Sequence, residues 1–261
     1  MADAGPRLSA LVVARNEEAM LGDCLASLGF ADEIVVVLDR SDDASADIAR
    51  AAGARVIEGA WELEGERRNL GIEACQGEWI VEIDADERVP EALADELRAH
   101  IADAAPGVYS MPVRNFIGGR EVAYGWGAYN GNGSAPRLFA KGHKTWGLDR
   151  VHPSIDLRGA RGNLQHGFIH LVDRDLPDMF DRLNRYSTLM ALDCAASGRI
   201  PGIATSIRRI FSRGWKSYVT RRGYREGTYG LALALFAALL PLITTLKARE
   251  IREREQEADR R

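Results

Sequence analysis

The sequence predicts an α/β fold, a Rossmann-like mixed sheet followed by a helical, membrane-associating C-terminal extension. Over the first hundred residues, short runs rich in Val and Ile alternate with stretches of helical periodicity, which is typical of βαβ units and a parallel sheet. Farther along, a basic segment precedes a strongly apolar one. At 261 residues the chain can bury a sizeable core, as one large domain or as a domain with an appendage.

The N-terminal part supplies the strands and helices of the predicted parallel sheet. The apolar runs predict four strands, at 8–14, 33–39, 55–59 and 79–85. The stretches between them predict three helices, at 15–28, 43–53 and 66–75. Pro90 opens a fourth helix that runs to about Ile101, because proline is favoured in the first turn of a helix.

Beyond Pro106 the pattern changes. We expect a strand at 108–116, a loop rich in Gly, Asn and aromatic residues at 117–135, and further strand candidates at 135–140, 150–157 and 167–172. An amphipathic helix follows at 178–197, then a basic, aromatic-studded stretch at 203–225 and an apolar one at 230–246. The expected domains are 1–175, with a donor half at 8–103 and an acceptor half at 104–175, and a helical region at 176–261.

Charge is divided unevenly along the chain. Residues 1–103 hold 24 acids and 9 bases, net −15, whereas residues 104–261 hold 14 acids and 25 bases, net +11. A basic half suits phosphate-bearing partners or an anionic membrane. The three cysteines, Cys24, Cys75 and Cys194, are far apart, which argues against a disulfide framework or zinc site. No basic region precedes the first apolar run, so we expect a cytoplasmic protein.

Polar residues follow three of the predicted strands, at 15–18, 39–43 and 84–86. In an open α/β sheet, ligands collect at these carboxyl ends. Asp84 and Asp86 lie two apart on the predicted strand and would share a face, where their repulsion calls for a cation. Mg²⁺ or Mn²⁺ bridging to a diphosphate explains the pair, and a solvated loop leading into a helix is the alternative. Neither GxGxxG nor GxxxxGK[ST] occurs after the first strand, so side chains and metal must hold a nucleotide.

Segments that follow one another along the chain resemble those of a known enzyme family. LSALVVARNEE, DEIVVVLDRSDDASADIA and GERRNLGIEACQGEWIVEIDADERV look like the nucleotide-binding half of family 2 glycosyltransferases, which have the GT-A fold. APRLFAKG, WGLDRVHP, FIHLVDRD and LNRYSTLMALD resemble the lipopolysaccharide-core glucosyltransferase (WaaE/KdtX-like) branch. The resemblance covers most of residues 8–250.

The resemblance implies roles for the residues at the strand ends. Asn16 and Glu17 would line the nucleobase pocket, Asp39 and Asp43 would hold base and ribose, and Arg68 would meet the diphosphate. Asp84 and Asp86 would be the metal ligands of the DxD motif. A helix N-cap is the alternative role for Asp43, and a solvated helix face for Arg68.

Two parts of the chain depart from the family pattern. The commoner pattern is VVDSGSTD, and Leu38 stands where its first acid would be, so Asp39 must take over that role from a shifted position. The family's Tyr-Pro-Asp before the RLF segment is replaced by AYNGNGSAP, and the acid that often follows VH is Pro153. The last two changes fall on the acceptor side.

The histidines and the catalytic base need separate consideration. His170 is a candidate third metal ligand or donor to the diphosphate, and His152 is a similar candidate. His100, His143 and His166 are expected to be structural. An inverting transfer needs a carboxylate to take the proton of the acceptor hydroxyl. Glu121 and Asp149 are the candidates, with Asp149 favoured because it adjoins the RVH segment; solvated loop charge is the alternative for each.

The C-terminal part predicts membrane contact without any resemblance. Residues 208–225 carry seven bases and no acid, with Trp215, Tyr218 and Tyr224 between them. The 17-residue run at 230–246 is at the lower limit for spanning a bilayer. An interfacial or re-entrant helix on anionic lipid therefore fits better than a full span, and a buried core or oligomer helix is the alternative. Nucleic-acid binding is not expected, since it leaves the apolar run unexplained.

Together these features predict an inverting, metal-dependent glycosyltransferase on the cytoplasmic face of the inner membrane. The resemblance implies transfer of glucose from UDP-glucose to the lipid-linked inner core of lipopolysaccharide, with Mg²⁺ or Mn²⁺ as cofactor. A polyprenyl-phosphate glycosyltransferase and a non-catalytic, membrane-docked protein of the same fold are the alternatives, and a homo-oligomer remains open.

Overall fold

The computed structural model describes residues 7–125, 133–149 and 153–259. The chain divides into two compact units. The first unit comprises Met1–Arg114 and Gly131–His170, and the second comprises Asn115–Asn130 and Leu171–Arg261. The predicted domain boundary between residues 175 and 176 stays a prediction.

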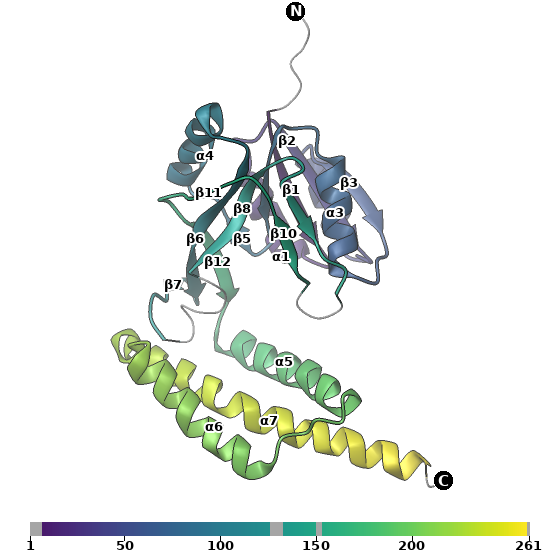
Figure 1. The fold of residues 1–261 in the computed structure, drawn as a ribbon, viewed down its shortest axis with the longest axis vertical. Helices are drawn as coiled ribbons and strands as arrows, with labels where there is room; N and C mark the ends of the chain where they lie inside the picture. Colours follow the sequence, from purple (N-terminus) through teal and green to yellow (C-terminus); the bar gives the residue numbers. More distant parts are fainter. Residues whose placement is uncertain (1–6, 126–132, 150–152, 260–261) are drawn as a thin grey trace, which may run out of the picture. The chain divides into compact units, whose positions relative to one another are not determined.

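The first unit contains the predicted parallel sheet. Its strands run in the order β3-β2-β1-β4, with β1 at Leu8–Ala14, β2 at Glu33–Asp39, β3 at Arg55–Gly59 and β4 at Trp79–Ile83. Figure 1 labels the first three of these strands. Every neighbouring pair in this group is parallel. The first three strands begin and end at the predicted residues. The fourth strand ends two residues earlier than predicted, before the two aspartates.

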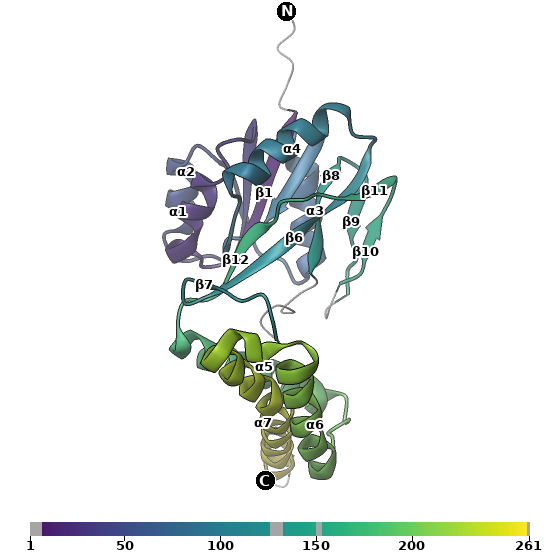
Figure 2. The same cartoon turned by 90° about the vertical axis from the view of Figure 1, so that its left-hand side faces the viewer.

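Four helices cover the two faces of this sheet. They are α1 (Glu18–Ala26), α2 (Ser45–Ala51), α3 (Glu64–Ala74) and α4 (Glu91–Asp103). Helices α1, α2 and α4 contribute to the core on one face, whereas α3 packs on the other (Figure 2). All seven residues of β1 are buried, because a central parallel strand is covered on both sides.

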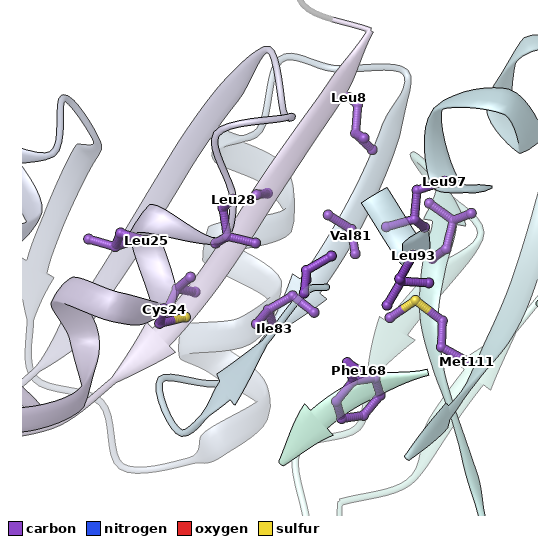
Figure 3. Packing of buried hydrophobic residues seen from close by; sticks show 14 of the residues in the cluster. Leu8, Cys24, Leu25, Leu28, Val81, Ile83, Leu93, Leu97, Met111 and Phe168 are labelled. Carbon is purple, nitrogen blue, oxygen red and sulfur yellow. The ribbon is translucent and has the colours of Figure 1, made fainter. Parts of the chain in front are cut away.

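The larger core lies between the sheet and α1, α2 and α4. Alternate residues of β1, including Leu8, enter this core, since successive strand side chains point to opposite faces. Cys24 and Leu28 meet the sheet from the α1 side, and Leu93 enters from α4 (Figure 3). The sheet's other face is packed by residues such as Leu11 and Ile72.

Antiparallel strands extend the sheet beyond β4, in the order β4-β8-β6-β12-β5. These are β8 (Ser134–Ala140), β6 (Gly107–Ile117), β12 (Phe168–Asp173) and β5 (Glu87–Arg88). The edge strand β11 (Ala160–Asn163) pairs with β6, and β9 (Lys144–Trp146) forms a hairpin with β10 (Ile155–Leu157). The predicted mixed sheet is confirmed, whereas β5, β9 and β11 had no counterpart in the sequence analysis. Within the 150–157 candidate, only β10 is a described strand.

The second unit is helical. It contains α5 (Leu176–Ala196), α6 (Ile203–Trp215), a π-helical turn (Lys216–Thr220), a 3₁₀ turn (Gly223–Glu226) and α7 (Gly227–Asp259). A short strand, β7 (Arg120–Glu121), lies in the predicted loop and pairs with the end of β6. Helix α7 packs against both α5 and α6. The chain segment that contains α7 is long and apolar enough to cross a membrane, and 56% of its most apolar window is buried within the chain.

Candidate active site

The carboxyl ends of three parallel strands meet at one edge of the sheet. Strand β1 lies between β2 and β4, with Ala14 opposite Leu38 and Val12 opposite Ile83. The polar segments that follow these strands, 15–18, 39–43 and 84–86, are therefore neighbours, as the sequence predicts. This edge is where an open α/β sheet binds its ligands.

Hydrogen bonds tie the first two of these segments together. Asn16, in the left-handed conformation with φ of 54°, donates from Nδ2 to Asp42 Oδ1 at 2.8 Å and accepts from the Asp42 backbone N–H at 3.0 Å. The Glu17 backbone N–H donates to Ser45 Oγ at 3.0 Å. The starts of α1 and α2 are thereby held side by side.

Asp43 accepts backbone N–H groups at the start of both helices. Its carboxylate receives bonds from Glu18 at 2.9 Å and from Ser45 at 3.0 Å. Burial raises the pKa of Asp43, but the hydrogen bonds to its carboxylate together outweigh burial and hold the pKa below its usual range. Asp43 thus bonds the first residue of each helix without being the N-cap, which is Glu17 for α1 and Ala44 for α2, and its contact with a nucleotide stays a prediction.

Asp39 is buried on the face of the sheet opposite to Leu38. Its carboxylate accepts from the Trp61 backbone N–H at 3.1 Å and pairs with Arg67 and Arg40, each at 3.0 Å. Burial raises the pKa of Asp39, but these donors outweigh it and leave the pKa lowered. Leu38 belongs to the core that α1 and α2 cover, so Asp39 and Leu38 point to opposite sides. Its role toward the nucleotide stays a prediction.

The two aspartates of the DxD motif lie in a turn. The Glu87 backbone N–H donates to the Asp84 carbonyl at 2.9 Å, and the Asp84 N–H donates to the Glu87 carboxylate at 2.8 Å. The expectation that Asp84 and Asp86 extend one face of a strand is therefore wrong, because the chain turns after Ile83 and aspartate favours turns over strands.

The turn gives the two carboxylates different partners. Asp84 pairs with Arg68 at 3.1 Å and with Arg137 at 2.5 Å, and these guanidiniums hold its pKa well below the usual range despite burial. The Asp86 side chain is 38% exposed and lies 3.4 Å from His170 Nε2. Burial lowers the pKa of His170, but the Asp86 carboxylate outweighs it and raises the pKa.

A buried network of charges supports this turn. Arg68 pairs with Glu82 at 2.5 Å and with Glu64 at 2.8 Å, and Lys144 also pairs with Glu82. Burial would raise the pKa of Glu82, but Lys144 and Arg68 lower it to about 2. Arg68 is 8% exposed, so its alternative placement on a solvated helix face is wrong.

We did not anticipate five members of the network from the sequence, Glu64, Glu82, Glu87, Arg137 and Lys144. Glu82 had a signal, since a carboxylate inside the apolar run WIVEI needs a buried partner. Arg137 and Lys144 had none, because both lie far along the chain, Arg137 on β8, which pairs antiparallel with β4, and Lys144 on β9. Burial beside Asp84 and Asp86 raises the pKa of Glu87 to about 8, although Arg137 lies 2.6 Å away and acts against the rise.

The fit of a divalent metal depends on Asp86 and His170. Among the described residues, no group of three His, Cys, Asp or Glu side chains is placed to hold a metal. Asp84 is already engaged by two arginines. Mg²⁺ in nucleotide sites is commonly held by one or two carboxylates together with substrate phosphates. The residues present therefore fit a metal that is completed by the donor's diphosphate.

The candidate bases belong to different units. Asp149, in the first unit, is exposed and accepts from Ser154 Oγ at 3.1 Å. Glu121, in the second unit, is exposed in β7. The choice between them stays a prediction, and His152 lies outside the described residues. His166 pairs with Glu96 at 2.9 Å, and His100 packs edge-on against Tyr109, as expected of structural histidines.

Comparison with known proteins finds glycosyltransferases among the relatives of this chain. The sequence model of glycosyl transferase family 2 matches residues 9–149. The lipopolysaccharide core biosynthesis glycosyltransferase LpsC of Rhizobium meliloti is 29% identical over 250 residues, which cover 92% of this chain and 91% of LpsC. An uncharacterized glycosyltransferase of Rickettsia bellii is 24% identical over 94% of this chain and 87% of its own length.

Solved structures give a partial match. Glucosyl-3-phosphoglycerate synthase from Mycobacterium tuberculosis, in complex with Mn²⁺, UDP and glucosyl-3-phosphoglycerate, is 27% identical, with a TM-score of 0.35. The match covers 44% of this chain and 46% of the synthase, so this chain spans less than half the length of that protein.

The family match includes most of the elements that form the site, whereas His170 on β12 lies beyond it. Residues 9–149 contain β1 to β4, the turn with Asp84 and Asp86, and the arginines that pair with it. The mixed sheet is GT-A-like, with the polar segments at its carboxyl edge, and the fold implied by the sequence resemblance is confirmed. This chain belongs to glycosyl transferase family 2.

Proposed function

We propose that this protein is an inverting, metal-dependent hexosyltransferase that moves glucose from UDP-glucose to the lipid-linked inner core of lipopolysaccharide. The observation that carries the proposal is the meeting of three polar segments at the carboxyl edge of the sheet, with Asp86 half-exposed among them. Similarity to LpsC along 92% of the chain supports the lipopolysaccharide acceptor.

The donor would be held by the edge segments. Asn16 and Glu17 would line the nucleobase pocket, and Asp39 and Asp43 would contact base and ribose. Arg68 is a buried side chain whose guanidinium also fixes Asp84, so its contribution to the diphosphate would be positive charge and a rigid turn. Arg137 would act in the same way.

Asp86 and His170 would hold Mg²⁺ or Mn²⁺ together with the diphosphate. The metal, when bound, supplies positive charge that stabilises the departing UDP. Asp84 would position the turn through its two arginines, since its carboxylate is already paired. Asp86, with only the 3.4 Å contact to His170, would be the carboxylate available to the metal.

Asp149 would take the proton from the acceptor hydroxyl, with Glu121 as the second candidate. Inversion needs the base on the side of the sugar opposite to the leaving UDP. Asp149 is exposed to solvent, and its carboxylate oxygen Oδ2 accepts a hydrogen bond from the Ser154 hydroxyl. That hydrogen bond orients the carboxylate. The enzyme would work at the cytoplasmic face of the inner membrane, where a lipid-linked acceptor is reached.

A donor screen tests the proposal. Purified full-length protein is incubated with Mn²⁺, a panel of sugar nucleotides and a lipid extract, and released nucleoside diphosphate is measured. UDP-glucose should give the fastest release, EDTA should stop it, and Asp86→Ala should abolish it. If no sugar nucleotide yields nucleoside diphosphate, the alternative of a non-catalytic protein would replace the proposed activity. A glucosylated polyprenyl phosphate as product would replace the lipopolysaccharide acceptor.

A further inference from the structure

The α6–α7 hairpin exposes large apolar side chains in two regular rows. Phe211 is 73% exposed and Trp215 is 66% exposed. In the first row the residues recur every fourth position along α6 and its π-helical turn, and in the second row they recur mostly at the same interval along α7. The resulting apolar face consists of Ile207, Phe211, Trp215, Val219, Leu231, Leu235, Leu239 and Leu246.

Both rows lie on the same side of the hairpin. The helices run antiparallel, because Ser206 bonds Thr245 at 2.8 Å and a Cβ on Gly214 would lie 3.6 Å from the Ala238 Cβ. On α6, the exposed Ile207 and Trp215 directly follow the contact residues Ser206 and Gly214. On α7, the exposed Leu239 and Leu246 directly follow Ala238 and Thr245. An equal rotation away from the contact on two antiparallel helices brings both rows to the same side. The rows therefore form one continuous face.

The α6 row of the apolar face is flanked by positive charge. Residues 194–249 contain ten bases and one acid, Glu226. Glu226 is buried and accepts from the backbone N–H groups of Ala123 at 2.9 Å and Tyr124 at 3.0 Å. Arg208 and Lys216, each next to a member of the apolar row on α6, are exposed. Exposed bases therefore flank the row on α6, whereas on α7 the exposed acid Glu250 lies one helical turn beyond Leu246, 4.0 Å from Arg254.

We infer that this apolar face lies in the plane of an anionic bilayer. Phe211 and Trp215 would enter the boundary between headgroups and acyl chains, and Arg208 and Lys216 would reach the lipid phosphates. The inference rests on the proposed function only in that a lipid-linked acceptor brings the enzyme to a membrane. The predicted interfacial element, 230–246, becomes the second row, and α6 supplies the aromatic anchors.

Two observations favour a bilayer surface over other occupants. A second copy of the same face would bring basic residues against basic residues, which is unfavourable. A span by α7 would separate it from its polar partners, since Lys247 Nζ donates to Asn184 Oδ1 at 2.6 Å and to Ser187 Oγ at 2.9 Å on α5. An anionic bilayer complements both the charge and the apolar rows.

Vesicle binding by the full chain, without donor or acceptor, tests the inference. Vesicles of phosphatidylethanolamine and phosphatidylglycerol are compared with phosphatidylcholine vesicles. Phe211→Ser with Trp215→Ser should lower the partition coefficient about 100-fold, because burial of each large side chain contributes about tenfold or more. The matched control is Leu189→Ser, since Leu189 is 55% exposed on α5 between Arg185 and Asp193. This control should bind like wild type.

The charge contribution has its own pair of variants. Arg208→Glu with Lys216→Glu should weaken binding to the anionic vesicles, and Arg252→Glu with Arg254→Glu, the same charge change near the end of α7, should have far less effect. Equal binding of wild type and the Phe211/Trp215 variant would overturn the inference. The inference would also be overturned if the wild type were a dimer that does not bind vesicles and the Phe211/Trp215 variant were a monomer. An inactive enzyme whose apolar face still binds vesicles would refute the proposed activity and leave this inference standing.

Discussion

At the scale of single residues, the two aspartates of the DxD turn have separable tasks. Asp84 pairs with two nearly buried arginines, whereas Asp86 is half-exposed and contacts only His170 among the pairs described for it. Asp84→Ala should lower the free energy of unfolding by about 3 kcal/mol, because it leaves buried guanidiniums short of a partner. Asp86→Ala should lower it by less than about 1 kcal/mol. Both should lose transferase activity.

Urea unfolding and UDP release, measured on the same preparations, check this division. Asp86→Asn serves as the matched control, since it keeps the shape of the side chain and removes its charge. Equal destabilisation by the two alanine variants would show that Asp84 has no special structural role.

Asp32 provides a residue-scale prediction far from the active site. It accepts from the Leu8 and Arg7 backbone N–H groups and pairs with Arg98 at 2.6 Å. The hydrogen bond from Arg98 is the main cause that lowers the pKa of Asp32 from 3.8 to about 2. Because the pKa is lower in the folded state, the carboxylate stabilises the fold above pH 3.8, and this contribution disappears as the pH falls toward 2.

Asp32→Asn should therefore lower the free energy of unfolding at pH 7 by about 1 kcal/mol, a value reduced for solvent screening of an exposed pair. The difference from wild type should shrink between pH 4 and pH 3. Urea titrations at pH 7, 4 and 3 measure it, with Asp47→Asn in α2 as a control on an exposed carboxylate. A difference that does not change with pH would mean that charge is not the cause.

At the scale of elements, the start of α3 is packed directly against the backbone that follows β9. A Cβ on Gly65 would lie 2.0 Å from the Gly147 carbonyl oxygen. Although alanine is the better helix former by about 1 kcal/mol, Gly65→Ala should destabilise the protein by about 1–3 kcal/mol. UDP binding should also weaken, because α3 carries Arg67 and Arg68.

Gly22→Ala in α1 is the matched control, since a Cβ there would meet only Ile48 Cγ2 at an ordinary 3.7 Å. It should be neutral or stabilise by up to about 1 kcal/mol. Thermal unfolding and calorimetry with UDP give both quantities. If Gly65→Ala behaves like Gly22→Ala, the close approach of α3 to Gly147 has no energetic consequence.

The elements also show what the sequence could predict. Strands β1, β2 and β3 were predicted to the residue. Buried parallel strands such as β1 and β2 are continuous Val- and Ile-rich runs, and the edge strand β3 keeps a short Val-Ile core between polar or glycine residues. Strands β5, β7, β9 and β11 have two to four residues, too few for any periodicity. Arg137 and Lys144 were hidden for another reason, since their partners Asp84 and Glu82 lie far earlier in the chain and no local pattern links them.

At the scale of the whole molecule, the donor residues and the apolar face belong to different units. If the second unit serves to hold the enzyme at the membrane, Phe211→Ser with Trp215→Ser should impair only reactions at a membrane. Transfer to an acceptor embedded in anionic vesicles should fall by about 100-fold at low enzyme concentration, in proportion to the lost partitioning. The kcat/KM for a deacylated, water-soluble acceptor should not change, since the donor residues are untouched.

Measuring transfer to both the vesicle-embedded and the water-soluble acceptor shows which step the Phe211/Trp215 variant affects. An equal loss on both would place Phe211 and Trp215 at the reacting groups, and no loss on either would show that membrane binding does not limit transfer. Restoring the rate by raising the enzyme concentration separates the causes further. A variant that only partitions poorly recovers as the bound amount rises, whereas a variant with a damaged site stays slow at every concentration.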